Sequence, residues 1–186
     1  MDAPVIWTVG HSTHDADTFL AILRAHAIEA IADVRRFPGS RRHPHFGRDA
    51  LRALLASAGI AYHGFPALGG RRAPRPDSPN TAWRNAAFRG YADYMASAEF
   101  AHAAQRLEQL SAMQRTAILC AEALWWRCHR ALISDYLKAR GVQVRHITDA
   151  GPASTHPFTR PAHVVDGRLS YGETQLDIAP ALPSAD

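Results

Sequence analysis

The regular alternation of short apolar runs with amphipathic segments is the feature that most constrains the fold of this chain. The apolar runs, each typical of a buried strand, lie at residues 5–9, 30–34, 60–62, 116–120 and 142–147. The segments with helical spacing lie at residues 15–26, 49–58, 91–95, 98–113 and 128–140. Strands that alternate with helices indicate a parallel sheet covered on both faces. We therefore predict an α/β fold: a single doubly wound domain with a mainly parallel sheet flanked by helices.

The pattern changes after Asp149, which divides the chain into two parts. Residues 1–148 form the predicted α/β core domain, and residues 149–186 form a C-terminal extension. Within the extension, the Asp166-Gly167 pair favours a hairpin turn, and residues 179–186 are expected to form a loose tail. Inside the core, the Pro-, Gly- and Arg-rich segment 66–85 is long for a loop of a compact domain. We expect it to be a binding loop or a lid.

Positive charge is concentrated in two arginine-rich segments. The net charge is +4, and Lys138 is the single lysine. Five arginines lie between residues 35 and 48 without an acidic residue, and five more lie between residues 71 and 89, opposed only by Asp77. The planar guanidinium group suits bidentate contact with phosphate or carboxylate. A general preference for arginine would explain the missing lysines but not this clustering, so we predict an anion-binding site.

Neither membrane insertion nor secretion is indicated by the sequence. It contains no apolar stretch of membrane-spanning length and no N-terminal secretory pattern. The two cysteines, Cys120 and Cys128, do not form a disulfide framework of the kind found in small secreted domains. We therefore expect a cytoplasmic protein without a membrane partner.

Polar residues and glycines follow nearly every predicted strand. In chain order they are His11 and Ser12, Asp33 and Arg35, Gly69, Gly70 and Arg71, Cys120 and Glu122, and His146. Ligands of open parallel sheets bind outside the carboxyl ends of the strands. One His or Asp at such a place is usually a structural hydrogen-bonding group, but their coincidence at one edge predicts a common site.

Cys128 and His129 open the last predicted helix of the core. Leu132 and Ile133, four positions further along, must face the sheet, so Cys128 and His129 are predicted to point inward as well. The positive end of a helix favours a thiolate or a bound anion. The structural alternative is that both side chains merely fill the core. Arg130 is predicted to point off this face, as a phosphate clamp or the partner of a carboxylate.

Familiar reactive motifs fit this segment poorly. A phosphatase or rhodanese loop places an arginine six positions after its cysteine, where this chain has Trp126 after Cys120. Cys120, Cys128 and His129, with His11, could hold a metal, but the paired-ligand spacing of zinc sites is absent, so no metal ligand is assigned. Neither a P-loop nor a Gly-rich dinucleotide fingerprint is present, so no cofactor is identified.

Several ordered motifs together resemble the family called domain of unknown function 488. They are TVGHS at 8–12, DVR at 33–35 with FPGSRR at 37–42, LGGRR at 68–72, SPN at 78–80 with WRN at 83–85, FRGYADYM at 88–95, the segment 120–130, and HI at 146–147. The resemblance covers residues 5–148 and implies a small α/β domain with a polar cluster at the sheet edge, but no reaction. Trp125 departs from the proline expected there, which affects the turn. The matching motif positions are His11, Ser12, Asp33, Arg35, Arg71, Arg84, Cys120, Glu122, Cys128, His129 and Arg130.

We expect an enzyme that acts on a phosphate-bearing substrate, a nucleotide or nucleic acid, with the reaction class left open. The candidate catalytic residues are His11, Asp33, Cys120, Glu122, Cys128 and His129. Glu122 or Asp33 is the candidate general base, with His11 or His129 as its partner. Cys120 or Cys128 is the candidate nucleophile or ligand.

Substrate or anion binding is expected from the residues of the arginine-rich segments and their neighbours. These are Ser12, Arg35, Arg41, Arg42, Gly69, Gly70, Arg71, Arg84 and Arg130. Trp83, Trp125 or Trp126 could stack on a base. One alternative is a non-catalytic nucleic-acid-binding module, which explains the arginines but not the inward-facing Cys, His and Glu. The other is a metal- or redox-dependent enzyme on a small acidic substrate.

Overall fold

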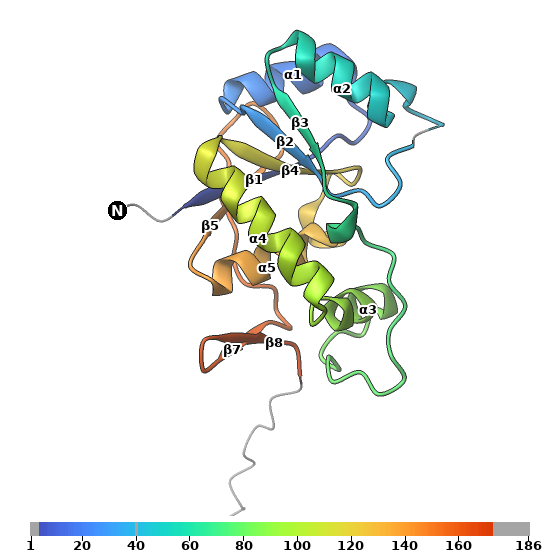
Figure 1. Cartoon of the computed structure of the whole chain (residues 1–186), viewed down its shortest axis with the longest axis vertical. Helices are drawn as coiled ribbons and strands as arrows, with labels where there is room; N and C mark the ends of the chain where they lie inside the picture. The colour runs from blue at the N-terminus through green and yellow to red at the C-terminus, as the bar shows by residue number, and fades with distance from the viewer. Residues whose placement is uncertain (1–3, 40, 173–186) are drawn as a thin grey trace, which may run out of the picture.

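A six-stranded sheet is the centre of the computed structural model, which describes residues 4–39 and 41–172 (Figure 1). Its strands are β1 (Val5–Gly10), β2 (Ala30–Asp33), β3 (Ala61–Gly64), β4 (Thr116–Cys120), β5 (Gln143–Ile147) and β6 (Ser154–Thr155), in the spatial order β3-β2-β4-β1-β5-β6. Strands β1 to β5 are parallel, and β6 pairs antiparallel with β5. The predicted α/β fold with a mainly parallel sheet is confirmed. The tail expected at residues 179–186 lies outside the described residues.

Helices cover both faces of the sheet (Figure 1). One face carries α1 (Ala16–Ala25) and α2 (Arg48–Ser57), and the other carries α3 (Ala86–Tyr94), α4 (Ala98–Met113) and α5 (Arg130–Ala139). Side chains alternate between the faces along each strand, so Trp7 packs in the α1–α2 layer and Ile6 in the opposite layer. Strands β1, β2 and β4 are buried on both faces, which explains the nearly continuous apolar runs in their sequences.

Side-chain caps explain where helices α1 and α3 begin. Asp15 caps α1 by accepting a hydrogen bond from the Thr18 N–H at 2.7 Å. Asn85 caps α3 through the N–H groups of Ala87 and Phe88, so this helix starts earlier than the predicted 91–95. Helix α5 begins at Arg130 instead of Cys128, because a short 3₁₀ turn, Trp125–Arg127, intervenes and leaves Cys128 extended.

The predicted C-terminal hairpin is present as β7 (His163–Val165) and β8 (Arg168–Ser170). Its turn residues Asp166 and Gly167 both have positive φ, 49° and 74°. This is the backbone conformation that a two-residue Asp-Gly turn provides between right-twisted strands.

A chain of buried hydrogen bonds ties the C-terminal extension to the core. Asp135 of α5 accepts from His156 at 3.0 Å and from the Tyr171 hydroxyl at 2.9 Å. His156 in turn bonds His146 at 2.8 Å, and His146 bonds the Thr8 hydroxyl at 2.7 Å. Because a carboxylate only accepts, the donors run from Thr8 through the two imidazoles to Asp135. Burial, with the neighbouring His156, lowers the pKa of His146 to about 3, so its ring is neutral at pH 7.

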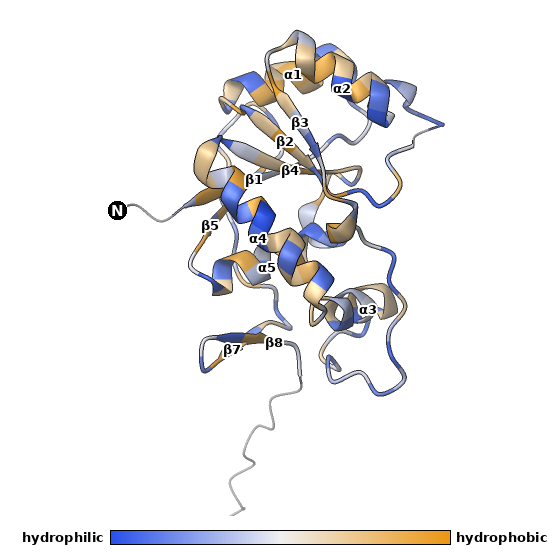
Figure 2. Ribbon diagram, viewed as in Figure 1, coloured by the Kyte–Doolittle hydropathy of each residue, from blue (hydrophilic) through white to orange (hydrophobic). Residues whose placement is uncertain are grey.

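The carboxyl ends of the parallel strands lie at one edge of the sheet, where the loops after β2 and β3 are largely hydrophilic (Figure 2). Gly10, at the end of β1, is needed there because a Cβ would overlap the Glu122 carbonyl. The loops after β1 and β4 are joined by main-chain bonds from His11 N–H to Cys120 O and from Ser12 N–H to Ala121 O, both 2.9 Å. In the described part of the chain, none of the helices combines the length and apolar character needed to cross a bilayer.

Candidate functional site

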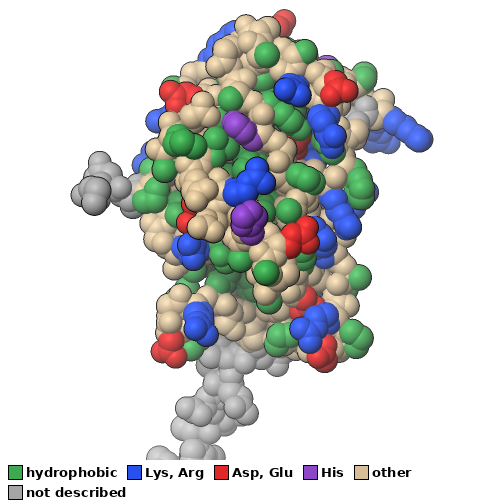
Figure 3. Space-filling model, in the orientation of Figure 1, with side chains coloured by type: hydrophobic (Ala, Val, Ile, Leu, Met, Phe, Trp, Pro, Cys, Tyr) green, Lys and Arg blue, Asp and Glu red, His purple; other side chains and the backbone are tan. Residues whose placement is uncertain are grey.

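A pocket of about 800 Å³ opens at the carboxyl edge of the sheet. Its walls come from the loops after β1, β2 and β4, the segment around Gly70, helix α3 and the start of α5. In Figure 3, Lys and Arg side chains gather along the right-hand margin, the side on which the loops after β2 and β3 lie in Figure 1. The edge predicted from the strand ends therefore holds a pocket large enough for a small-molecule ligand.

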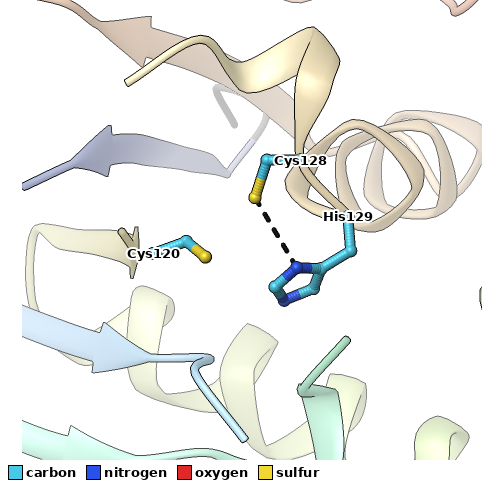
Figure 4. Close-up of side chains that lie close together, drawn as sticks. All are labelled: Cys120, Cys128 and His129. Carbon is cyan, nitrogen blue, oxygen red and sulfur yellow. Dashed lines mark hydrogen bonds between the residues drawn. The ribbon is translucent and has the colours of Figure 1, made fainter. Parts of the chain in front are cut away.

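Cys120, Cys128 and His129 lie together in this pocket (Figure 4). Cys120 ends β4, and the other two precede α5. Their two Sγ atoms and one imidazole nitrogen all lie within 4.8 Å of one another, and Cys128 Sγ is 3.6 Å from His129 Nδ1. His129 Nε2 donates to the Val34 carbonyl at 3.2 Å, which leaves Nδ1 facing the sulfur atoms. In the structure, Cys128 and His129 point inward, toward Cys120 and the pocket, as predicted.

The two cysteines are chemically unequal. The pKa of Cys128 lies well below its usual value, chiefly because the Cys120 side chain hydrogen-bonds to its sulfur. The same contact, together with burial, raises the pKa of the Cys120 thiol. The pKa values of the two thiols are therefore shifted in opposite directions.

A buried ion pair fixes the floor of the pocket beside β2. Arg35 donates to Asp33 from its main-chain N–H at 3.1 Å, from Nε at 2.9 Å and from Nη2 at 2.7 Å. The Tyr62 hydroxyl donates at 2.8 Å to Asp33 Oδ2, the oxygen that also accepts from Arg35 Nη2. The Nη1 group of Arg35 donates to the Phe46 carbonyl at 2.7 Å and to His11 Nε2 at 3.3 Å. Asp33 is fully engaged in holding Arg35, which itself lines the pocket.

His11 is held as a neutral ring by the same network. Its Nδ1 donates to the Ser12 carbonyl at 2.9 Å, and its Nε2 accepts from Arg35. Burial is the main reason that its pKa is lowered to about 4. Because neither nitrogen is free, His11 serves to position Arg35 and does not join the Cys120–Cys128–His129 cluster.

Most of the sequence-predicted site residues meet in this pocket. Those that line it are His11, Ser12, Arg35, Arg41, Arg42, Gly70, Arg71, Cys120, Glu122, Cys128 and His129. Ser12 and Arg71 have positive φ values of 48° and 61°. Non-glycine residues seldom adopt this conformation, and it is concentrated at functional sites.

Four predicted residues lie elsewhere. Asp33 lies beneath the pocket, Gly69 packs closely against Arg36, and Arg84 lines a separate hollow beside Arg160 and His163. Arg130, expected to point outward, is only 1% exposed and donates to the Glu122 carbonyl. It therefore braces the loop after β4 and does not reach the pocket.

Several pocket residues were missed by the sequence analysis. They are Thr13, Arg36, Phe37, Gly39, His43, Ala87, Phe88, Tyr91, Ala121, Ala123 and Arg127. Phe37 is 67% exposed, and a bulky apolar side chain inside an arginine-rich loop was a signal for it. Tyr91 had no such signal. Its ring approaches that of His129, with centroids 5.2 Å apart, only because the folded chain places α3 beside the start of α5.

The tryptophans expected to stack on a base are placed differently. Trp83 is buried against Phe88 and Tyr171, and Trp125 stacks on His146 with ring centroids 4.2 Å apart. Trp126 is 52% exposed. None of the three lines the pocket in the described structure, so Phe37 is the better candidate for stacking.

The comparison with known families agrees with the motifs in this site. A family model described as Domain of unknown function DUF488 matches residues 15–137. The chain belongs to this DUF488 family. The match covers the β2 arginine segment, both cysteines and His129, so the pocket is largely built from family-matched sequence. No curated protein and no solved structure matches the chain.

Proposed function

We propose that this DUF488 protein is an enzyme that acts on a phosphate-bearing substrate, a nucleotide or a nucleic acid. The observation that carries the proposal is the content of one pocket. Among the described residues, six arginines line it, namely Arg35, Arg36, Arg41, Arg42, Arg71 and Arg127, against the single carboxylate of Glu122. The same pocket contains the Cys120–Cys128–His129 cluster. A binding module explains the first group of residues, but a reaction explains both.

The size, charge and lining of the pocket support this substrate class. A volume of about 800 Å³ is within the ~300–1,000 Å³ usual for small-molecule sites. Guanidinium groups contact phosphate oxygens in pairs, and Arg41, Arg42 and Arg71 are exposed on the pocket wall, where they support such contacts. The exposed ring of Phe37 at the rim offers a surface on which a base can stack.

The hydrogen bonds also distinguish the candidate acids and bases whose polar atoms are occupied within the protein from the one that is exposed to the pocket. Asp33 is occupied by Arg35 and Tyr62, and His11 by Arg35 and Ser12. Glu122 is exposed at the pocket wall, where one carboxylate oxygen accepts from the Leu124 N–H at 3.2 Å. Glu122 therefore remains as the general base, beside the Cys–His cluster.

Binding of polyanions should depend steeply on salt and on the pocket arginines. Each phosphate neutralised by an arginine releases counterions, so log affinity falls linearly with log salt. We expect Arg71→Gln to weaken binding of single-stranded DNA or RNA about tenfold and to lower the salt slope by about 1. The check is a titration of labelled oligonucleotides at several salt concentrations. Arg84→Gln is the matched control, because Arg84 is exposed but lies outside the pocket. Equal losses in both variants would contradict a specific phosphate site.

Replacing Glu122 with Gln should separate catalysis from binding. The carboxylate is exposed, so we expect Glu122→Gln to change the free energy of unfolding by no more than ~0.5 kcal/mol. Loss of a general base should lower turnover by at least ~100-fold. Turnover is measured on a panel of nucleotides and oligonucleotides, with Asp166→Asn in the distant hairpin as the control. If the parent shows no turnover and the variant binds equally well, the protein is a binding module.

A further inference from the structure

The Cys120–Cys128–His129 cluster has the composition of a metal site that needs one more ligand. Two sulfur atoms and one imidazole nitrogen converge within 4.8 Å. In a tetrahedral zinc site, with Zn–S of ~2.3 Å and Zn–N of ~2.0–2.1 Å, sulfur and nitrogen ligands lie ~3.6 Å apart and two sulfurs ~3.8 Å apart. The Cys128 Sγ to His129 Nδ1 distance is 3.6 Å. Closing the cluster around an ion therefore requires shifts of only about 1 Å.

His129 is oriented as a metal-ligating histidine is. Its Nε2–H donates to the Val34 carbonyl at 3.2 Å, so Nδ1 is the ring nitrogen that faces the sulfurs (Figure 4). Such a carbonyl or carboxylate partner on the far nitrogen is the usual way in which a ligating imidazole is fixed. On the near side, a Cβ at Gly70 would lie 2.9 Å from Nδ1, so the glycine leaves room beside this atom.

The cluster is also open on one side. All three side chains line the pocket that the arginines surround, so a fourth position would face bound substrate. Three protein ligands with an open fourth position are the arrangement of catalytic zinc sites, whereas structural sites use four protein ligands. Two thiolates and an imidazole are soft ligands that select zinc over magnesium or calcium.

We propose that Cys120, Cys128 and His129 bind one Zn²⁺ ion, with its fourth coordination position open to the arginine-lined pocket. The motif is hidden in the sequence because two ligands are adjacent in the chain and the third comes from a neighbouring strand. Zinc would place a Lewis acid beside the phosphate-binding arginines of the proposed function. The binding of the ion itself requires no substrate and is tested without one.

Metal content is the first measurement. Protein purified without chelator should contain one zinc per chain by elemental analysis. Cys120→Ser, Cys128→Ser and His129→Gln should each lower zinc affinity at least ~100-fold in a competition with a chromogenic chelator, since even the loss of an outer-shell partner costs 10–100-fold. Gly70→Ala keeps all three ligands and should weaken zinc through contact with Nδ1. His102→Asn, on the exposed side of α4, is the control for adventitious binding by surface histidines.

Cobalt and thiol protection test the coordination directly in the parent protein. Co²⁺ added to the metal-free protein should give the visible absorption of tetrahedral thiolate coordination. Both cysteines should resist alkylation with zinc present and react after its removal. Absence of zinc and of a cobalt spectrum would overturn the proposal, as would zinc that persists in the three ligand variants or another metal in its place. Oligonucleotide binding by the zinc-free protein is scored separately, so failure of the metal site and failure of the phosphate site remain distinguishable.

Discussion

Replacing Asp33 with alanine should destabilise the protein by about 3–5 kcal/mol, because it leaves the buried Arg35 charge without its partner. Arg35 and Asp33 have side chains only 7% and 1% exposed, and the pair is joined at 2.7 Å. The variant also removes the hydrogen-bond acceptor of the Tyr62 hydroxyl. In the parent protein, burial and then Asp33 raise the pKa of this hydroxyl to about 12. Urea denaturation of Asp33→Ala against the parent measures the loss.

An exposed pair of the same residue types provides the control. Arg75 and Asp77 are also joined at 2.8 Å, but their side chains are 60% and 72% exposed. Ion pairs between exposed side chains contribute little to stability, so Asp77→Ala should have little effect. The double variant Asp33→Ala, Arg35→Met should recover part of the stability, since no buried charge remains. Equal losses at Asp33 and Asp77 would refute the structural role given to this pair.

Acid should destabilise the protein well before its carboxylates titrate. His11 and His146 have folded pKa values lowered to about 4 and about 3, mainly by burial, against an unfolded value near 6.5. Their stabilising contribution is present above pH 6.5. It is lost as the pH falls toward the folded values, because the unfolded state then binds more protons. Between pH 8 and pH 5 each histidine should remove about 2 kcal/mol, about 4 kcal/mol in total.

The pH dependence is measured by urea denaturation at a series of pH values. His11→Asn retains a donor toward Ser12 and should reduce the pH-dependent loss to about half. His102→Gln, an exposed histidine, should leave the profile unchanged. A free energy of unfolding that stays flat between pH 7 and pH 5 would show that the two buried rings take up protons as readily in the folded protein as in the unfolded chain.

The amino-acid sequence by itself determined the fold class and the edge at which the site lies. Period and composition mark β1, β2 and β4 as buried strands, and the rule that parallel strands present their carboxyl ends together then brings His11, Cys120 and Glu122 to one place. These features depend on local patterns and on general topology, so they are readable without coordinates. The hairpin turn at Asp166-Gly167 is equally local.

Only the tertiary structure decided which polar residue does what. Asp33 and Glu122 are both carboxylates at the end of a predicted strand. In the structure, Asp33 is buried against Arg35 and Tyr62, whereas Glu122 is exposed at the pocket wall. Arg130 follows directly after His129, but its side chain lies in the interior against the Glu122 carbonyl. Such roles depend on which distant groups satisfy a side chain's hydrogen bonds and charge. That pairing is fixed by packing across the sheet, which no short-range pattern in the chain specifies.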